Sequence, residues 1–60
     1  MEKKLIVIAA IARVTYLLSV LKTEVEKETL DKEVVMARLM NTRENFELLY
    51  SSVIDLTAGA

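Results

Sequence analysis

Hydroxyl and carboxylate side chains are the groups in this 60-residue chain that could do chemistry. Serine, threonine and tyrosine are possible nucleophiles, but the chain has no histidine or cysteine to complete a catalytic triad. The carboxylate pairs Glu24/Glu28 and Glu44/Glu47 have helical spacing, yet a helical di-metal site also needs histidine. The single glycine, Gly59, excludes a glycine-rich phosphate loop. We therefore predict no enzymatic activity, no cofactor and no metal site.

Charge is nearly balanced along the chain. Eight Lys and Arg residues oppose nine Asp and Glu residues, so the formal net charge is −1. No basic stripe is present, and we therefore expect no nucleic-acid partner. The charged residues concentrate in Lys22–Glu33, which we interpret as a solvated helix face or turn region with surface ion pairs.

Two segments carry apolar residues at alternating spacings of four and three, which is typical of a packed amphipathic helix. The first line is Val7, Ile11, Val14, Leu18, Leu21 and Val25, and the second is Val35, Leu39, Thr42, Phe46, Leu49, Val53 and Leu56. Polar residues such as Arg13 and Asn45 fall on the opposite faces. Neither segment shows the two-residue period of a strand, so the sequence predicts an all-α protein.

The junction between the two segments allows two interpretations. The two lines share one register, so a single long helix is an alternative to a hairpin. That helix would place Glu28 and Lys32 at successive seam positions, which disfavours it. Thr29 is a possible N-cap, and Asp31 and Glu33 would place negative charge in a first helical turn. These features favour a helical hairpin.

The predicted fold is therefore a two-helix antiparallel hairpin in a single domain, residues 1–60. We expect the first helix at about residues 3–27, a bend at 27–30 and the second helix at about 30–57. Gly59 follows the last apolar position, where a glycine typically ends a helix.

Apolar residues are more numerous than one helix pair can bury, because 53% of the chain is hydrophobic. The surplus is expected mainly on the first helix, at Leu5, Ile6, Ile8, Ala10, Leu17 and Val20. Assembly of two hairpins into a four-helix bundle would bury this surface. A higher oligomer or a complex with another protein would meet the same need.

The surface predicted to form an oligomer or partner interface lies on both helices. It comprises Ile8, Ile11, Val14, Leu17, Leu18, Leu21, Val35, Leu39, Phe46, Leu49 and Val53. Arg13, Tyr16 and Tyr50 are further candidates to face a partner, because each combines an apolar stem or ring with a polar tip. Met36 and Phe46 are expected to pack in the core.

The leading functional hypothesis is a cytoplasmic, non-catalytic protein-interaction module of the adaptor, inhibitor or chaperone type. It would act as a homo-oligomer, with a dimer favoured. The plan resembles, in architecture alone, small dimeric helical hairpins such as plasmid RNA-binding regulators and secretion chaperones. A dimeric RNA-binding regulator is therefore a second alternative.

A membrane-associated miniprotein is the first alternative. Fourteen of the seventeen residues in Leu5–Leu21 are apolar. As a helix this stretch would be about 26 Å long, shorter than a hydrocarbon core of about 30 Å, and Arg13 lies in its middle. The stretch Leu5–Ala12 also has features of a signal peptide. Cleavage after Ala12 would leave only 48 residues, which disfavours a signal peptide. The clustering of polar residues on one side of the first helix favours a soluble amphipathic helix over a membrane span.

Overall fold

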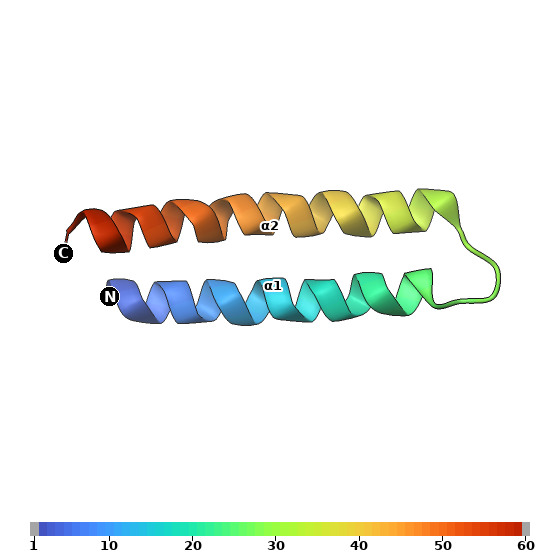
Figure 1. Ribbon diagram of the computed structural model, residues 1–60, viewed down its shortest axis with the longest axis horizontal. Coiled ribbons are helices and arrows are strands. Elements are labelled where there is room, and N and C mark those ends of the chain that lie inside the picture. The colour runs from blue at the N-terminus through green and yellow to red at the C-terminus, as the bar shows by residue number, and fades with distance from the viewer. Residues whose placement is uncertain (1, 60) are drawn as a thin grey trace.

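The computed structural model describes residues 2–59, which form two α-helices joined by a short linker (Figure 1). Helix α1 spans Lys3–Val25 and helix α2 spans Lys32–Ala58. The helices run antiparallel, with the linker at one end and Glu2 and Gly59 at the other. The predicted all-α antiparallel hairpin is confirmed, and the single long helix is wrong. The predicted domain limits, residues 1 and 60, lie outside the described residues.

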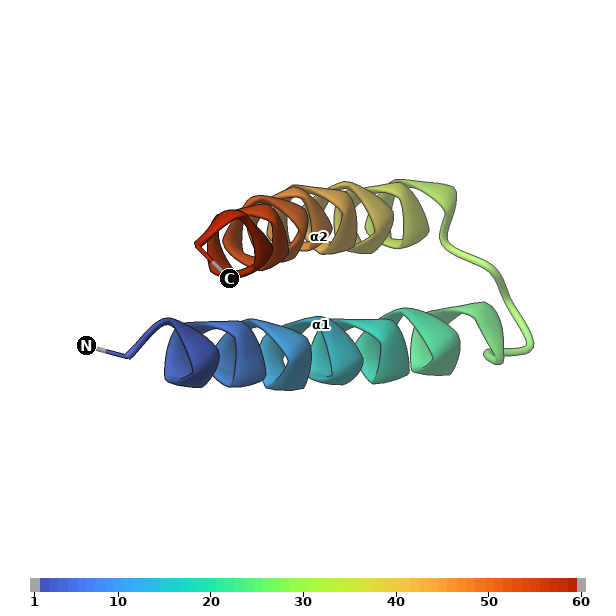
Figure 2. The ribbon, with the colours of Figure 1, turned by 60° about the vertical axis from the view of Figure 1, so that its left-hand side comes forward.

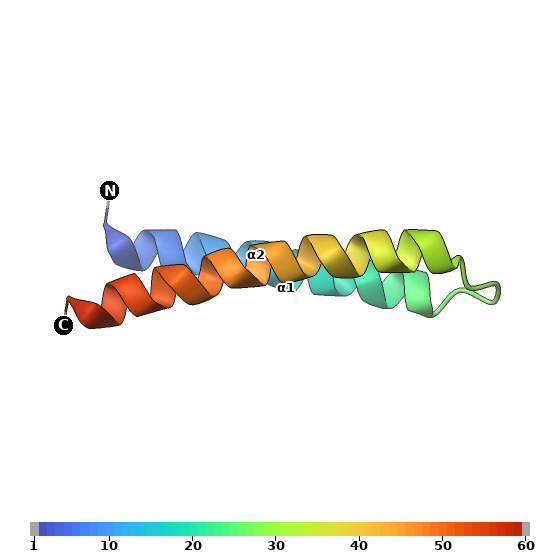
Figure 3. The same ribbon diagram turned by 90° about the horizontal axis from the view of Figure 1, so that it is seen from above.

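The molecule is a thin rod. It measures 47 × 14 × 14 Å, and its radius of gyration is 14.1 Å. A compact domain of this length would have a radius of gyration of about 10 Å. Views from two further directions show that each helix has one neighbour and that the helices cross at a shallow angle (Figures 2 and 3). Most of the surface of each helix is therefore free of intrachain contacts.

Both ends of helix α1 are closed by backbone hydrogen bonds. The carbonyl oxygen of Glu2 accepts from the N–H of Leu5 at 3.1 Å, and no side chain caps this end. The last turn closes when Glu26 N–H donates to the carbonyl oxygen of Lys22 at 3.0 Å. The cationic Lys22 in this turn interacts favourably with the helix dipole. The helix stops at Val25, two residues before the predicted end.

Helix α2 begins with a carboxylate cap. Asp31 Oδ1 accepts from the backbone N–H groups of Glu33 at 3.1 Å and Val34 at 3.2 Å. The N-cap is therefore Asp31 and not the candidate Thr29, and α2 begins two residues after the predicted start at about residue 30. An ionised carboxylate satisfies these N–H groups and also interacts with the positive end of the helix dipole, which a hydroxyl does only weakly. The linker is therefore Glu26–Asp31, longer than the predicted bend.

Gly59 is the C-cap residue of α2, as predicted. Its φ angle is −89°, so it does not adopt the left-handed conformation common at helix ends. No residue in the range 2–59 has a positive φ angle. The linker conformation is therefore accessible to ordinary L-residues, which explains how a hairpin forms without a glycine between its helices.

The hairpin is held together by two facing lines of side chains, which we call the inner seam. Its residues, all buried or half-buried, are Val7, Ala10, Val14, Leu17, Leu21 and Glu24 on α1, and Val35, Thr42, Asn45, Leu49, Ser52 and Leu56 on α2. Val20 and Val34 are also half-buried and flank this contact. On α1 the inner-seam residues recur at spacings of three and four, as required for a continuous contact with a neighbouring helix.

The line predicted for α1 is partly wrong. Val7, Val14 and Leu21 lie in the inner seam, as expected. At the alternate positions the structure uses Ala10, Leu17 and Glu24, each one residue before the predicted Ile11, Leu18 and Val25. Consecutive residues on a helix are separated by about 100°, so this difference corresponds to a rotation of α1 about its axis.

Helix α2 is rotated in the same sense. Val35, Thr42, Leu49 and Leu56 face α1, as predicted, but the intervening apolar residues do not. Asn45, expected on the opposite face, is half-buried in the inner seam. Both rotations leave large apolar side chains outside the helix–helix contact.

Candidate functional site

The exposed apolar side chains form a second pair of lines, which we call the outer seam. Its positions are Ile8, Ile11, Thr15, Leu18, Lys22 and Val25 on α1, and Met36, Leu39, Arg43, Phe46, Tyr50 and Val53 on α2. On both helices they recur at spacings of three and four, each one residue after an inner-seam line. Each helix therefore carries two adjacent surfaces, both with the periodicity of a helix-packing surface.

The two halves of the outer seam lie on one face of the hairpin. Viewed down the long axis of the hairpin, successive residues run clockwise around one helix and counterclockwise around its antiparallel neighbour. A step of one residue forward in both sequences therefore turns both lines of side chains toward the same face of the hairpin. In antiparallel helix pairs, equivalent flanking positions are therefore neighbours. The result is one continuous apolar face contributed by both helices.

The outer seam is more apolar than the inner seam. Its three polar positions are Thr15, Lys22 and Arg43, and the other nine are aliphatic or aromatic. Those nine side chains are exposed, from 37% at Val53 to 62% at Tyr50. A contiguous apolar surface with this exposure is typical of a protein or membrane interaction site.

The inner seam includes polar side chains that are satisfied within the chain. Thr42 Oγ1 donates to the carbonyl oxygen of Arg38 at 2.8 Å. Asn45 Nδ2 donates to the carbonyl oxygen of Asn41 at 2.8 Å, and Asn45 Oδ1 accepts from Arg13 Nε at 2.8 Å. Among residues 2–59, no buried side-chain polar atom lacks a hydrogen-bond partner. The inner seam therefore has no unpaired polar group directed at a ligand.

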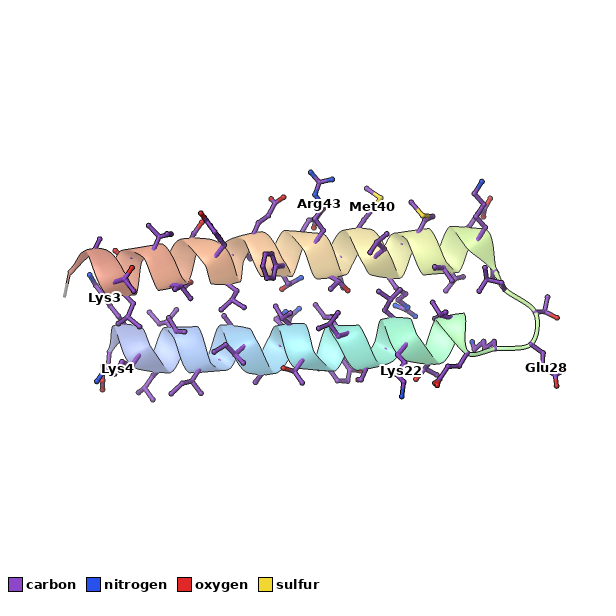
Figure 4. All side chains as sticks on the ribbon, in the orientation of Figure 1. Lys3, Lys4, Lys22, Glu28, Met40 and Arg43 are labelled. Atoms are coloured by element: carbon purple, nitrogen blue, oxygen red, sulfur yellow. The ribbon has the colours of Figure 1, made fainter. Side chains whose placement is uncertain are left out.

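The charged residues of the outer seam are both cationic. Figure 4 shows Lys22 and Arg43 pointing outward from the two edges of the hairpin. Each forms an ion pair one helical turn further on: Lys22 Nζ with Glu26 at 3.7 Å, and Arg43 Nε with Glu47 at 3.3 Å. No acidic residue occupies the outer seam itself, so the polar groups that it offers to a partner are the cationic donors of Lys22 and Arg43 and the hydroxyl groups of Thr15 and Tyr50.

The opposite flank of the hairpin, which we call the mixed face, has a different composition. Its positions precede the inner-seam lines by one residue and include Ile6, Arg13, Tyr16 and Val20 on α1, and Val34, Asn41, Leu48 and Asp55 on α2. Two contacts cross between the helices here: the Arg13–Asn45 hydrogen bond and an ion pair of 3.5 Å between Lys3 Nζ and Asp55. Polar contacts on this side therefore fix the register of the two helices.

The eleven predicted interface residues divide between the two seams. Five of them line the inner seam and hold the hairpin together: Val14, Leu17, Leu21, Val35 and Leu49. The other six are exposed on the outer seam: Ile8, Ile11, Leu18, Leu39, Phe46 and Val53. The second group is available to another molecule. Val25, Met36 and Tyr50 extend the same surface.

The three predicted partner-facing residues are not brought together. Arg13 is engaged with Asn45 on the mixed face. Tyr16, 66% exposed, follows Arg13 by three residues and lies on the same side of α1. Tyr50, 62% exposed, belongs to the outer seam on the other flank. A single partner surface formed by all three is therefore not supported by the hairpin.

Two expectations about apolar residues are wrong for the hairpin. Met36 and Phe46, expected in the core, are 46% and 53% exposed, because α2 turns them away from α1. The apolar surplus is also not concentrated on the first helix. Leu17 is buried, and α2 contributes exposed residues that the sequence lines did not include, among them Leu48 and Ile54. Sequence alone does not show which of two adjacent lines meets the neighbouring helix.

Residues 2–59 contain no group of three acidic, histidine or cysteine side chains placed to hold a metal ion. A shallow hollow on α2 is lined by Met40, Arg43, Glu44 and Glu47, which are neighbours on one helix face. Helix α1 is long and apolar enough to cross a membrane by length and composition, and 17% of its apolar window is buried.

Comparisons with protein-family models, curated proteins and solved structures found no match.

Proposed function

We propose that this chain is a non-catalytic helical interaction module of the adaptor, inhibitor or chaperone type that acts as a homodimer. The outer seam supports this proposal most directly. It is a helix-packing surface on both helices, its large side chains are exposed, and it is more apolar than the surface that closes the hairpin. Packing against further helices removes such a surface from water.

The exposed area of the chain also supports association. The hairpin exposes 4933 Å². A compact monomer of 6.8 kDa would expose about 4,000 Å². The excess of about 1,000 Å² follows from the rod shape, in which each helix has a single neighbour. Exposed apolar area is unfavourable by roughly 25 cal/mol per Å², so an arrangement that covers it is favoured.

The exposed area favours a second copy of the chain as the partner that covers the outer seam. A compact dimer would expose about 6,600 Å², compared with twice 4933 Å² for two separate hairpins. Association could therefore bury up to about 3,300 Å² in total, within the range of obligate homodimers. Because the outer seam has helix-packing periodicity, two copies can present it to each other without remodelling the hairpin.

Sedimentation velocity at micromolar concentration tests this function. We expect a helical species of twice 6.8 kDa, with dissociation visible on dilution. A folded, fully helical monomer of 6.8 kDa across the concentration range would contradict the proposal. Circular dichroism on the same samples shows whether the chain is folded.

Membrane association through α1 is a second candidate function, favoured by the length and composition of that helix. Its 23 residues span about 35 Å, and its apolar stretch Leu5–Leu21 spans about 26 Å, close to a hydrocarbon core of about 30 Å. Lys3 and Lys4 lie at one end and Lys22 lies near the other, where lysines can reach the interface. Recovery of the chain in the soluble fraction without detergent would exclude this function. Retention in the membrane fraction after alkaline washing would support it.

A further inference from the structure

We infer that two copies pack outer seam against outer seam with both linkers at the same end, each α1 lying against α2 of the other copy. This inference rests on the proposed homodimer and specifies its geometry. Two face-to-face hairpins can be related by a two-fold axis parallel to the helices or perpendicular to them. The parallel axis places the linkers together, and the perpendicular axis places them at opposite ends.

The register of the hairpin decides which residues are level with each other along the rod. The Arg13–Asn45 hydrogen bond and the Lys3–Asp55 ion pair place these residues at matching heights. Counting forward along α1 and backward along α2 from these contacts makes Thr15 level with Arg43. The same count makes Ile8 level with Tyr50, and Lys22 level with Met36.

A two-fold axis parallel to the helices keeps every residue at its own height. The level residues of the outer seam then meet across the interface between copies. Arg43 meets Thr15 of the second copy, whose hydroxyl can accept a hydrogen bond from the guanidinium. Tyr50 meets Ile8, and the aliphatic stem of Lys22 lies along Met36 while its ammonium stays in water. Each cation therefore has a compatible neighbour.

A perpendicular axis gives a less favourable interface. To overlap the two outer seams fully, this axis must pass through their midpoint, which lies at the height of Thr15 and Arg43. Arg43 of one copy then lies level with Arg43 of the other, half-way along the rod, at the edge of the interface toward which this side chain points (Figure 4). Like charges placed next to each other across an interface oppose binding. Moving the axis along the rod separates the two Arg43 side chains, but it leaves apolar residues of the outer seam uncovered at one end of each hairpin.

The charges of the linker have less influence on this choice. Glu26, Glu28 and Asp31 lie beyond the apolar part of the outer seam and are exposed to solvent, as are Lys27 and Lys32, which offset part of their charge. Exposed charges are screened within about 8–10 Å at physiological salt. The Arg43 side chain is also exposed, at 80%, but in the perpendicular arrangement its two copies would lie opposite each other on helices about 10 Å apart, within this screening distance.

Spin-label distances test the arrangement directly. The chain has no cysteine, so Glu28→Cys at the linker and Glu2→Cys at the other end each give one label per copy. Glu28 projects from the linker and lies outside both seams (Figure 4). Double electron–electron resonance then measures the distance between equivalent labels in the dimer. Dilution with unlabelled chain confirms that the signal is intermolecular.

We expect short distances at both sites, roughly 10–30 Å, because neighbouring helices are separated by about 10 Å and the label arms add to this. Distances close to the 47 Å length of the rod at both sites would overturn the arrangement while leaving the dimer intact. A 6.8 kDa species without an intermolecular signal would overturn the proposed homodimer and, with it, this geometry. The two failures are therefore distinguishable.

Discussion

The inner and outer seams have the same periodicity but different compositions. The inner seam closes the hairpin with Val, Leu and Ala residues interrupted by Glu24, Thr42, Asn45 and Ser52. The outer seam carries larger side chains, including Phe46, is interrupted at three polar positions, and is left exposed by the hairpin. The surface with the larger apolar side chains is thus the one that stays outside the contact between α1 and α2.

This difference shows how the chain divides its helix surfaces between folding and assembly. In a four-helix bundle every helix needs two adjacent packing surfaces, one for each neighbour. Both helices here have two such surfaces, offset by one residue. The sequence is therefore better suited to a helix with two neighbours than to a helix with one, which is the physical basis for proposing association.

A charge in the outer seam should have the largest effect. Leu39→Glu places a carboxylate in the proposed dimer interface, where desolvation opposes its burial. We expect the dimer dissociation constant to rise by at least about 100-fold, equivalent to about 3 kcal/mol. Sedimentation of the variant should show a helical monomer at concentrations where the parent chain is dimeric.

Leu48→Glu is the matched control for this variant. Leu48 lies on the mixed face of the same helix and is 65% exposed. Its replacement by glutamate should leave the dimer intact, because this face remains in water. Equal loss of dimer in both variants would contradict the assignment of the outer seam as the interface.

Truncation in the inner seam should lower stability by an intermediate amount. Leu17 is 8% exposed in the contact between α1 and α2. Leu17→Ala should lower the free energy of unfolding by about 2–4 kcal/mol through lost burial and a residual cavity. Urea unfolding followed by circular dichroism at a fixed chain concentration measures this change.

Leu5→Ala provides the comparison. Leu5 is 55% exposed and lies outside both seams, so its truncation should change stability by less than about 0.5 kcal/mol. If the two alanine variants were equally stable, α1 would not pack against α2 through the face seen in the structure.

The cap of α2 should contribute a smaller amount. Asp31→Ala removes the acceptor for two backbone N–H groups and should destabilise the fold by about 1 kcal/mol. Thr29→Ala, at the N-cap predicted from sequence, should change stability by only a few tenths of a kcal/mol. Thermal unfolding of both variants tests the start of α2. A larger effect at Thr29 would restore the predicted boundary.

The polar contact between the helices should have the smallest effect. Arg13→Ala removes the exposed hydrogen bond to Asn45, for which we expect a loss of about 0.5–1 kcal/mol. A double-mutant cycle with Asn45→Ala isolates the pair. A coupling energy near zero would show that this contact does not help to set the helix register.

The sequence predicts the two helices and their antiparallel pairing well. Periodicity, the charged run between the helices and Gly59 all indicate a hairpin. The rotation of the helices is not predictable in the same way, because residues three and four positions after Val14 are both leucines, Leu17 and Leu18. Hydrophobicity alone cannot select one of them for the contact within the chain.

The candidate site is predicted in part for the same reason. The sequence identifies most of the apolar residues of both seams but cannot assign them to folding or to assembly. Polar inner-seam residues such as Asn45 are missed, because a polar side chain normally indicates a solvent-facing position. Its pairing with Arg13 depends on two residues far apart in the sequence.

The Lys3–Asp55 ion pair brings the first turn of α1 beside the last turns of α2, so the described ends of the chain lie together at the pole opposite the linker. With the linkers of two copies at one pole, all four ends would be neighbours at the other. A short flexible connector could then join two copies in tandem into one polypeptide. Such a tandem chain would make assembly independent of concentration, because each half would supply the other at a high effective concentration.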